Sequence, residues 1–250
     1  MQNAADAPRI PRPASTVMLV RDRPGGGLAV YMTRRSARSR FVPDAYVFPG
    51  GKVDEADRRP AHLGRLVGAV GGCGPEFVVA ALRELLEEAG VLLACRENGA
   101  PAAPAAELRA RLRSELAAGG EFAASLARRG LFLDARELTY YSNWVTPESE
   151  PLRFDVHFFI ARAPHGQEPA ADAVEVHDGR WLEPADALAR AERGELAIIF
   201  PTRKHLERLA AFASVDELLA HARGRRRISP VLSYQRDDGE FDLQPGHEAW

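Results

Sequence analysis

Apolar and polar residues follow two different periods along this chain, and each period predicts a different kind of element. Short runs rich in β-branched and aromatic residues predict strands over residues 15–21, 28–34, 45–48, 91–95, 137–145, 154–161 and 180–182. Longer stretches of helix-forming residues predict helices over residues 75–89, 107–118, 121–129, 183–193, 201–212 and 215–223. Together these elements predict an α/β fold.

The segments between these elements suggest how the chain is organised. Three glycines after Pro24 predict a turn that joins the first two strands into a hairpin. Residues 1–14 are rich in Ala and Pro, so we expect a flexible N-terminal arm, followed by a single elaborated domain over residues 15–250. Residues 58–74 are rich in Gly, Arg and Pro and show no period, which predicts an inserted loop.

Two further segments are expected as additions to that domain. The segment from about residue 101 to about residue 130 is dominated by Ala, Arg, Glu and Leu, which predicts a helical insertion. The C-terminal part, about residues 201–250, is expected to contain two helices and then a tail that forms a short hairpin or a closing flap.

Composition excludes several classes of protein. A chain of 250 residues with 46% hydrophobic residues can bury a substantial core. A net charge of −2 and a pI near 6.4 do not support binding to nucleic acid or to a membrane surface. There is no signal-peptide pattern and no apolar run of about 18 residues, so a cytoplasmic protein is expected. Cys73 and Cys95 form no CxxC motif, so neither a disulfide framework nor a structural zinc site is expected.

The predicted helix over residues 75–89 carries three glutamates on one face. Glu84, Glu87 and Glu88 stand at i, i+3 and i+4, where like charges repel unless a cation neutralises them. Carboxylate oxygens suit Mg²⁺ or Mn²⁺, and Arg83 lies four residues before Glu87, where an ion pair can orient it. The alternative is an ordinary solvated helix, because Arg, Glu, Leu and Ala are all good helix formers.

A Pro-Gly-Gly sequence follows the strand candidate 45–48. Pro49 restricts the backbone, while Gly50 and Gly51 permit a positive φ and leave backbone N–H groups open to anionic oxygen. The two glycines are therefore candidate substrate-binding residues. An ordinary tight turn is the alternative interpretation.

Gly51 and the segment from Arg83 to Val91 together resemble the Nudix box. Its pattern is Gly, five residues, Glu, seven residues and then REUxEExGU, where U is apolar. The second half matches at every specified position. In the first half, Asp57 stands where the family has Glu, and 25 residues separate Asp57 from Arg83, so an insertion of about 18 residues interrupts the box. A loop tolerates such an insertion because closure entropy rises slowly with length.

A second motif lies just ahead of the box. The branch of the family that cleaves coenzyme A carries LLTxRSxxxRxxxGxxxFPGG, and eight of its residues stand here at the right spacings: Thr33, Arg35, Ser36, Arg40, Phe48, Pro49, Gly50 and Gly51. The departures are Tyr31, Met32 and Asp44. With the interrupted box, the chain most resembles the acyl-coenzyme A diphosphatase subgroup, over roughly residues 15–210.

The resemblance implies a fold and a reaction. The implied fold is a Nudix α/β/α sandwich with a mixed sheet, enlarged by the helical insertion and the helical C-terminal part. The implied reaction is metal-dependent hydrolysis of the diphosphate in coenzyme A or acyl-coenzyme A, giving 3′,5′-ADP and a 4′-phosphopantetheine product. The expected partner is thus a small nucleoside diphosphate derivative, with no nucleic acid or membrane partner, and a homodimer is possible within this family.

The resemblance also implies roles for individual residues. Glu84, Glu87 and Glu88 would bind Mg²⁺ or Mn²⁺, with Glu87 also counted as catalytic. The guanidinium of Arg83 would orient the carboxylates. Those of Arg35 and Arg40 would bind phosphate groups of the substrate, because guanidinium binds phosphate through two parallel hydrogen bonds.

Many Nudix enzymes use a further carboxylate outside the box, and Glu175 is the first candidate for that catalytic role. It lies six residues before Trp181, which belongs to the predicted strand 180–182, and a surface charge next to a loop is its other interpretation. Glu148 and Asp178 are alternative candidates. His157 is expected to be a strand residue. Four aromatic side chains either stack on adenine or belong to the core: Tyr140, Tyr141, Trp144 and Phe159.

Three rival functions remain open from the sequence. The first is hydrolysis of ADP-ribose or a dinucleotide in place of coenzyme A. A non-catalytic domain that senses a nucleotide is a second possibility, which the dense carboxylate cluster argues against. In a third, the glutamate helix is surface decoration on a structural protein, and Glu88→Gln would then only relieve repulsion.

Overall fold

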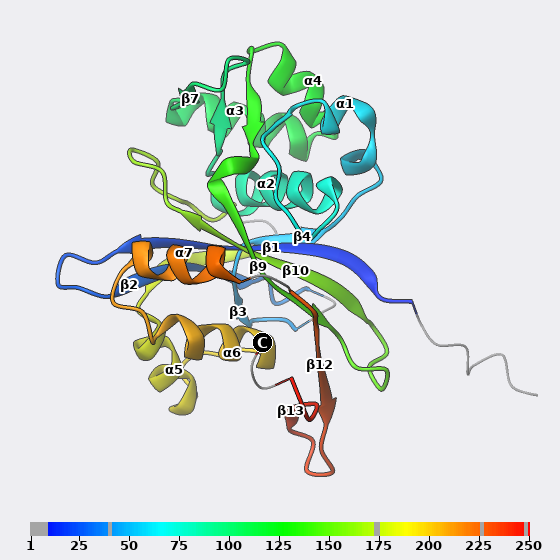
Figure 1. Ribbon diagram of the computed structural model, residues 1–250, viewed down its shortest axis with the longest axis vertical. Helices are drawn as coiled ribbons and strands as arrows, with labels where there is room; N and C mark the ends of the chain where they lie inside the picture. Colours follow the sequence, from blue (N-terminus) through cyan, green and yellow to red (C-terminus); the bar gives the residue numbers. More distant parts are fainter. Residues whose placement is uncertain (1–9, 40–41, 173–175, 226–227, 248–249) are drawn as a thin grey trace, which may run out of the picture.

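The computed structural model describes residues 10–39, 42–172, 176–225, 228–247 and 250. Within them, nine strands form a mixed sheet at the centre of the molecule (Figure 1). These strands are β1 (Arg12–Asp22), β2 (Leu28–Arg35), β3 (Tyr46–Val47), β4 (Gly50–Lys52), β9 (Leu138–Val145), β10 (Phe154–Arg162), β11 (Val176–Leu182), β12 (Pro230–Gln235) and β13 (Phe241–Leu243). Their order is β11-β2-β1-β10-β9-β12-β13, with β3 paired to β2 and β4 paired to β1.

Strand β1 is buried on both faces of the sheet. Successive side chains of a strand point to opposite faces, so Val17 and Leu19 enter one core while Met18 and Val20 enter the other. The strand runs parallel to β10 and antiparallel to β2. A nearly continuous apolar run is what a strand covered on both faces requires. Strand β10 lies between β1 and β9, in the interior of the sheet.

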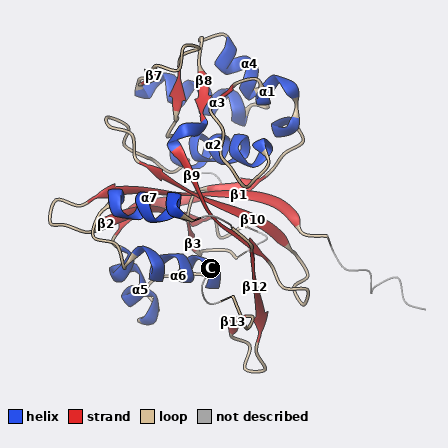
Figure 2. Cartoon of the chain, in the orientation of Figure 1, coloured by secondary structure: helices blue, strands red, loops and turns tan. Residues whose placement is uncertain are grey.

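Helices cover both faces of this sheet (Figure 2). Helix α2 (Pro75–Ala89) packs in the core that contains Val17, while α5 (Pro184–Glu192), α6 (Phe200–Leu209) and α7 (Val215–Gly224) pack in the opposite core. The result is the α/β/α arrangement that the family resemblance implies. None of the helices in the described residues is long and apolar enough to cross a lipid bilayer.

The bounds of α2 are those predicted from the sequence. Pro75 stands at its first turn, where a missing N–H costs nothing, and Gly90 ends it with a φ of +65°. The N–H of Gly90 bonds the carbonyl of Leu86 at 2.9 Å, and the N–H of Val91 reaches the carbonyl of Leu85 at 3.4 Å. One side of the helix is fully buried, which fixes its rotation and hence the direction of its glutamates.

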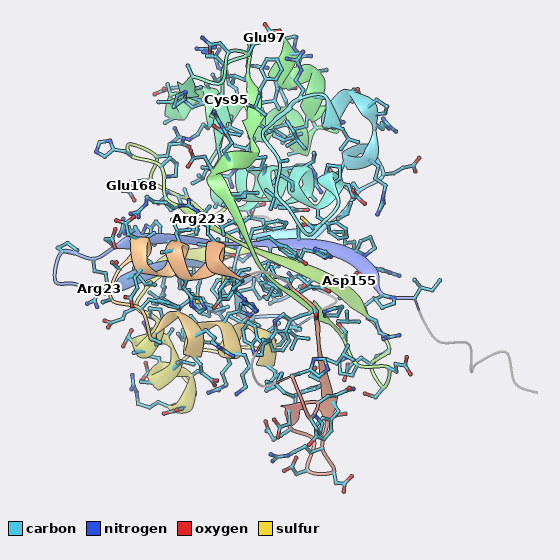
Figure 3. All side chains as sticks on the ribbon, in the orientation of Figure 1. Arg23, Cys95, Glu97, Asp155, Glu168 and Arg223 are labelled. Atoms are coloured by element: carbon cyan, nitrogen blue, oxygen red, sulfur yellow. The ribbon has the colours of Figure 1, made fainter. Side chains whose placement is uncertain are left out.

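The two insertions form one lobe above α2 in Figure 1. A four-stranded sheet joins them, in the order β5-β8-β6-β7. The elements of this lobe are α1 (Pro60–Leu63), β5 (Leu66–Val67), β6 (Ala94–Cys95), β7 (Pro101–Ala102), α3 (Ala106–Ala117), α4 (Phe122–Ala127) and β8 (Phe132–Asp134). Figure 3 labels Cys95 and Glu97 within it. We call it the inserted lobe.

Two predictions within the inserted lobe are wrong in part. Residues 58–74 are not one loop, since they contain α1 and β5, and only Ala94 and Cys95 of the expected strand 91–95 are in a ladder. The reason is that Leu66 pairs with Leu133, far along the chain, and such pairing leaves no local period. The helices predicted over 107–118 and 121–129 are confirmed as α3 and α4.

Both ends of the domain also differ from expectation. Strand β1 begins at Arg12, so residues 12–14 are not part of a loose arm; Arg12 pairs with Phe154, and its N–H bonds the carbonyl of Arg153 at 2.9 Å. Residues 1–9 lie outside the described part. The expected tail hairpin is confirmed as β12 and β13, and β12 also pairs with β9. Cys73 and Cys95 are both free thiols.

Candidate functional site

The three glutamates of α2 are not an ordinary solvated helix face. Glu88 is 5% exposed, and the side chains of Glu84 and Glu87 are 12% and 31% exposed. Oε2 of Glu88 accepts a hydrogen bond of 2.9 Å from the backbone N–H of Gly50. Because a buried carboxylate needs hydrogen bonds or an opposite charge, surface decoration is ruled out as the role of this face.

Arg83 is the positive charge at the centre of the cluster. Its Nη1 lies 2.8 Å from Oε1 of Glu84 and 2.6 Å from Oε2 of Glu87, so the predicted ion pair between Arg83 and Glu87 is confirmed. One guanidinium therefore offsets the repulsion between two of the three carboxylates. Glu88 is held separately, on Gly50.

Asp57 holds the other side of the same guanidinium. Nε of Arg83 donates to Oδ1 at 3.0 Å, Nη2 donates to Oδ2 at 2.9 Å, and the Asp57 side chain is completely buried. Nη2 also donates to the carbonyl of Lys52, and Oδ2 of Asp57 accepts from the N–H of Asp54. Burial opposes the charge on Arg83, but Asp57, Glu84 and Glu87 together raise its pKa above the ordinary value. The interrupted box is thus closed in space by Asp57, at the position where the family pattern has Glu.

The two glycines allow a close approach of β4 to its neighbours, and their assignment as substrate-binding residues stays a prediction. Neither Gly50 nor Gly51 has a positive φ, so the expectation of a left-handed backbone at these glycines is wrong. The N–H of Gly50 donates to Glu88, so the expectation of an open N–H is also wrong at Gly50. Both lie in β4 beside β1. A Cβ on Gly51 would stand 2.3 Å from Oε1 of Glu84, and one on Gly50 would stand 2.4 Å from the carbonyl oxygen of Ser15. Glycine is required here because the backbone, the strand and the carboxylates approach so closely.

The donors at this site suit a hard divalent cation, although they do not yet form a complete metal site. Within the described ranges, no group of three or more His, Cys, Asp or Glu side chains is arranged to hold a metal ion. Glu84 and Glu87 face Arg83, whereas Glu88 faces Gly50. Three carboxylates from one helix face nonetheless supply the oxygen ligands that Mg²⁺ or Mn²⁺ prefers.

A groove of about 590 Å³ lies where β2 ends, and Arg35 is part of its wall. Arg35 donates to the hydroxyl of Ser39 at 2.9 Å, and Arg34 pairs with Asp44 at 2.9 Å. The lining residues are Arg34, Arg35, Ser36, Ala37, Arg38, Asp44, His177 and Asp178. Three guanidinium groups against two carboxylates give this groove a positive balance, which suits a phosphorylated ligand.

The groove is connected to the glutamates through the chain itself. Thr33 and Arg34 of β2 pair with Val47 and Tyr46 of β3, and the chain reaches Gly50 three residues after Val47. Short connections of this kind leave little freedom between the two regions.

Two predicted site residues, Arg40 and Glu175, lie outside the described residues. Val176, which follows Glu175 in the sequence, pairs with Arg35 in the ladder between β11 and β2.

The two alternative carboxylates are poorly suited to act as a base. The guanidinium of Arg180 holds the pKa of Asp178 below its ordinary value, although burial acts to raise this pKa. The hydroxyl of Tyr46, which donates to Asp178 at 2.5 Å, lowers the pKa further. The carboxylate of Glu148 is 81% exposed and lies 4.0 Å from Arg153. A base near neutral pH needs a pKa close to the working pH, which Asp178 lacks.

The aromatic residues belong to the two cores. Tyr140, Tyr141, Trp144 and Phe159 are all at least 93% buried. The ring of His157 stacks on Phe77, with centroids 3.8 Å apart, and on Tyr140, at 5.2 Å, and burial lowers its pKa. The expectation of a strand histidine is confirmed, and core packing accounts for the aromatic residues.

Comparison with known proteins gives one family. The model of the NUDT19 Nudix domain matches residues 75–209. The chain is 30% identical to the acyl-coenzyme A diphosphatase NUDT19 of Gallus gallus, over 87% of this chain and 71% of that protein. It is 28% identical to the protein of the same name from Homo sapiens, over 96% of this chain and 76% of the relative.

A solved structure supports the same fold. A NUDIX hydrolase from Alicyclobacillus acidocaldarius superposes with a TM-score of 0.77 at 31% identity, over 90% of this chain and all of that one.

Proposed function

The chain belongs to the Nudix hydrolase family, and from that premise we propose that it hydrolyses the diphosphate of coenzyme A or an acyl-coenzyme A to 3′,5′-ADP and a 4′-phosphopantetheine product. One observation carries the proposal: the buried carboxylate face of α2 lies against Gly50 and Gly51, in a chain that aligns with acyl-coenzyme A diphosphatases over most of its length.

Nudix hydrolases generally need a divalent metal cation. We assign Mg²⁺ or Mn²⁺ to Glu84, Glu87 and Glu88, because these are the carboxylates that share one face of α2. When bound, such an ion neutralises phosphate charge and lowers the pKa of a water molecule.

The residues around the carboxylates have the tasks of orientation and binding. Arg83, itself held by Asp57, fixes the side chains of Glu84 and Glu87. The guanidinium of Arg35, on the wall of the cationic groove, binds a phosphate group of the substrate, and Arg40 is assigned the same task from the motif.

A proton acceptor for the attacking water is assigned to Glu175. The lowered pKa of Asp178 and the exposure of Glu148 favour Glu175 among the three candidate carboxylates. A cytoplasmic location and a homodimer stay predictions; sedimentation of the purified chain would test the second.

The experiment measures hydrolysis of coenzyme A, acetyl-coenzyme A, ADP-ribose and NADH with Mg²⁺ or Mn²⁺, comparing wild type with Glu88→Gln. Release of 3′,5′-ADP that EDTA abolishes and the variant lacks is the expected result. Variant-sensitive cleavage of ADP-ribose or NADH alone would keep the metal site and reject coenzyme A as the substrate. Tight nucleotide binding without turnover would favour a sensing domain.

A further inference from the structure

The last turn of α2 presents backbone carbonyls that the helix itself cannot satisfy. A helix leaves its final four carbonyl groups without partners inside the helix, and each must find a donor elsewhere. In α2 this turn contains Glu87 and Glu88, so whatever binds its carbonyls also fixes where these two carboxylates project. The carbonyl of Leu86 is bonded by Gly90 in the terminal turn, but those of Glu87 and Ala89 are bonded by residues from other elements.

Arg113 of the inserted lobe binds the carbonyl of Glu87. Its Nη2 donates at 2.7 Å and its Nε at 3.1 Å, so the guanidinium fork closes on a single oxygen. A cation at the C-terminal end of a helix is also favoured by the helix dipole. One turn earlier on α3, Arg109 donates from Nε to the carbonyl of Gly90 at 2.9 Å. Two arginines at i and i+4 of α3 therefore clamp the end of α2.

The same guanidinium reaches a third segment. Nη1 of Arg113 donates to the carbonyl of Ala170 at 3.1 Å, in the loop that leads to β11. The N–H of Ala170 in turn bonds the carbonyl of Ala89 at 2.9 Å. Gln167 of that loop exchanges two hydrogen bonds of 3.0 Å with the backbone of Leu92, just beyond α2. Arg113 thus stands where α2, the inserted lobe and the loop before β11 meet.

The surroundings of Arg113 keep its positive charge close to the carboxylates of α2. Burial lowers the pKa of Arg113, and the surrounding Asp172, Tyr31, Glu87 and Glu88 act in the opposite direction, so the cation lies within electrostatic reach of the carboxylate face. Arg111, two positions earlier on α3, is exposed and makes no such bridge in the described structure.

We propose that Arg113 is a positioning residue, which fixes the last turn of α2 against the loop before β11 and so sets the geometry of the Glu87 and Glu88 carboxylates. The inserted lobe is then a working part of the active site rather than an appendage. This inference rests on the proposed function in one respect only, namely that those carboxylates bind a divalent cation.

The test measures Mn²⁺ affinity by electron paramagnetic resonance, and kcat and KM for coenzyme A, in wild type, Arg113→Ala, Arg113→Lys and the control Arg111→Ala. Loss of a residue that orients metal ligands is expected to weaken Mn²⁺ binding about 10- to 100-fold in Arg113→Ala and to lower kcat similarly, with KM within about twofold. Arg113→Lys keeps the charge but not the fork, so an intermediate affinity is expected. The control is expected to match wild type.

Each outcome separates the role from mere stabilisation. A lower melting temperature for Arg113→Ala, with wild-type Mn²⁺ affinity and kcat, would overturn the inference, as would an equal loss in Arg111→Ala. If wild type binds Mn²⁺ but releases no 3′,5′-ADP, the proposed substrate fails while the affinity ratio still decides the role of Arg113. If Arg113→Ala does not fold, the ratio for Arg113→Lys decides it.

Discussion

The guanidinium of Arg83 and the carboxylate of Asp57 form two parallel hydrogen bonds across 26 positions of sequence, with N···O distances of 3.0 and 2.9 Å. This pair joins the two halves of the interrupted motif. It also holds in place the guanidinium that contacts Asp57, Glu84 and Glu87 together, so loss of the pair should affect both stability and activity.

We expect Asp57→Asn to lower the free energy of unfolding by ~3 kcal/mol, because removing one partner of a buried ion pair leaves the other charge poorly compensated. Urea unfolding followed by circular dichroism measures the change. The control is Asp54→Asn, whose carboxylate is 62% exposed and 3.6 Å from Nη2 of Arg83; a change below ~1 kcal/mol is expected there. Equal losses in both variants would contradict the assigned role of Asp57.

We expect Gly51→Ala to reduce turnover on the order of 100-fold, because the new Cβ would stand 2.3 Å from Oε1 of Glu84 and force that carboxylate to move. Gly71→Ala is the matched control, since a Cβ there meets nothing within 4 Å. Activity of the folded variants decides the matter. Wild-type turnover in Gly51→Ala would show that the position of Glu84 is not critical.

Arg35→Ala is expected to lower kcat/KM for coenzyme A by roughly 10- to 100-fold through a higher KM, because a charge-assisted contact with phosphate is lost. Dephospho-coenzyme A identifies the phosphate concerned: a smaller loss with this substrate would indicate the 3′-phosphate, and an equal loss the diphosphate. Arg23→Ala, in the hairpin between β1 and β2 (Figure 3), serves as control. An unchanged kcat/KM in Arg35→Ala would exclude it from substrate binding.

Stability is expected to fall as the pH is lowered below about 6, partly through His205. Burial lowers the pKa of this imidazole to about 3, and its two nitrogens lie 2.7 Å from Oγ of Ser142 and 2.6 Å from the carbonyl of Pro201. In the unfolded chain His205 is protonated as the pH falls below about 6.5, whereas in the folded chain it stays neutral down to about pH 3. Its contribution to stability is therefore complete above about pH 6.5 and is lost as the pH falls from about 6.5 to about 3.

The expected contribution of His205 is about 1.4 kcal/mol per pH unit in that range. Urea unfolding of wild type and His205→Gln between pH 7 and pH 4.5 isolates it, because His62 and His157, whose pKa values are also lowered by burial, are present in both proteins. Parallel pH profiles for the two proteins would show that His205 does not titrate in this way.

The sequence by itself determined the elements whose signal is local. Helix α2 was predicted to its last residue because Pro75 and Gly90 mark its ends and its apolar residues repeat with a helical period. The spacing of Glu84, Glu87 and Glu88 was enough to place three carboxylates on one face, and the spacing of Arg83 and Glu87 was enough to pair them. These relationships are confined to a few turns of one helix, so they survive any arrangement of the rest of the chain.

Only the tertiary structure decided which distant residues meet at that helix. Asp57 reaches Arg83 across an insertion, Gly51 is required by the nearness of Glu84, and Arg113 bridges α2 and the loop before β11. The two insertions become one lobe because β5 pairs with β8. These contacts depend on packing between segments that lie far apart in the sequence. Because the entropy of closing a loop rises only slowly with its length, the number of residues between such segments can vary, and no period in the sequence marks the contact.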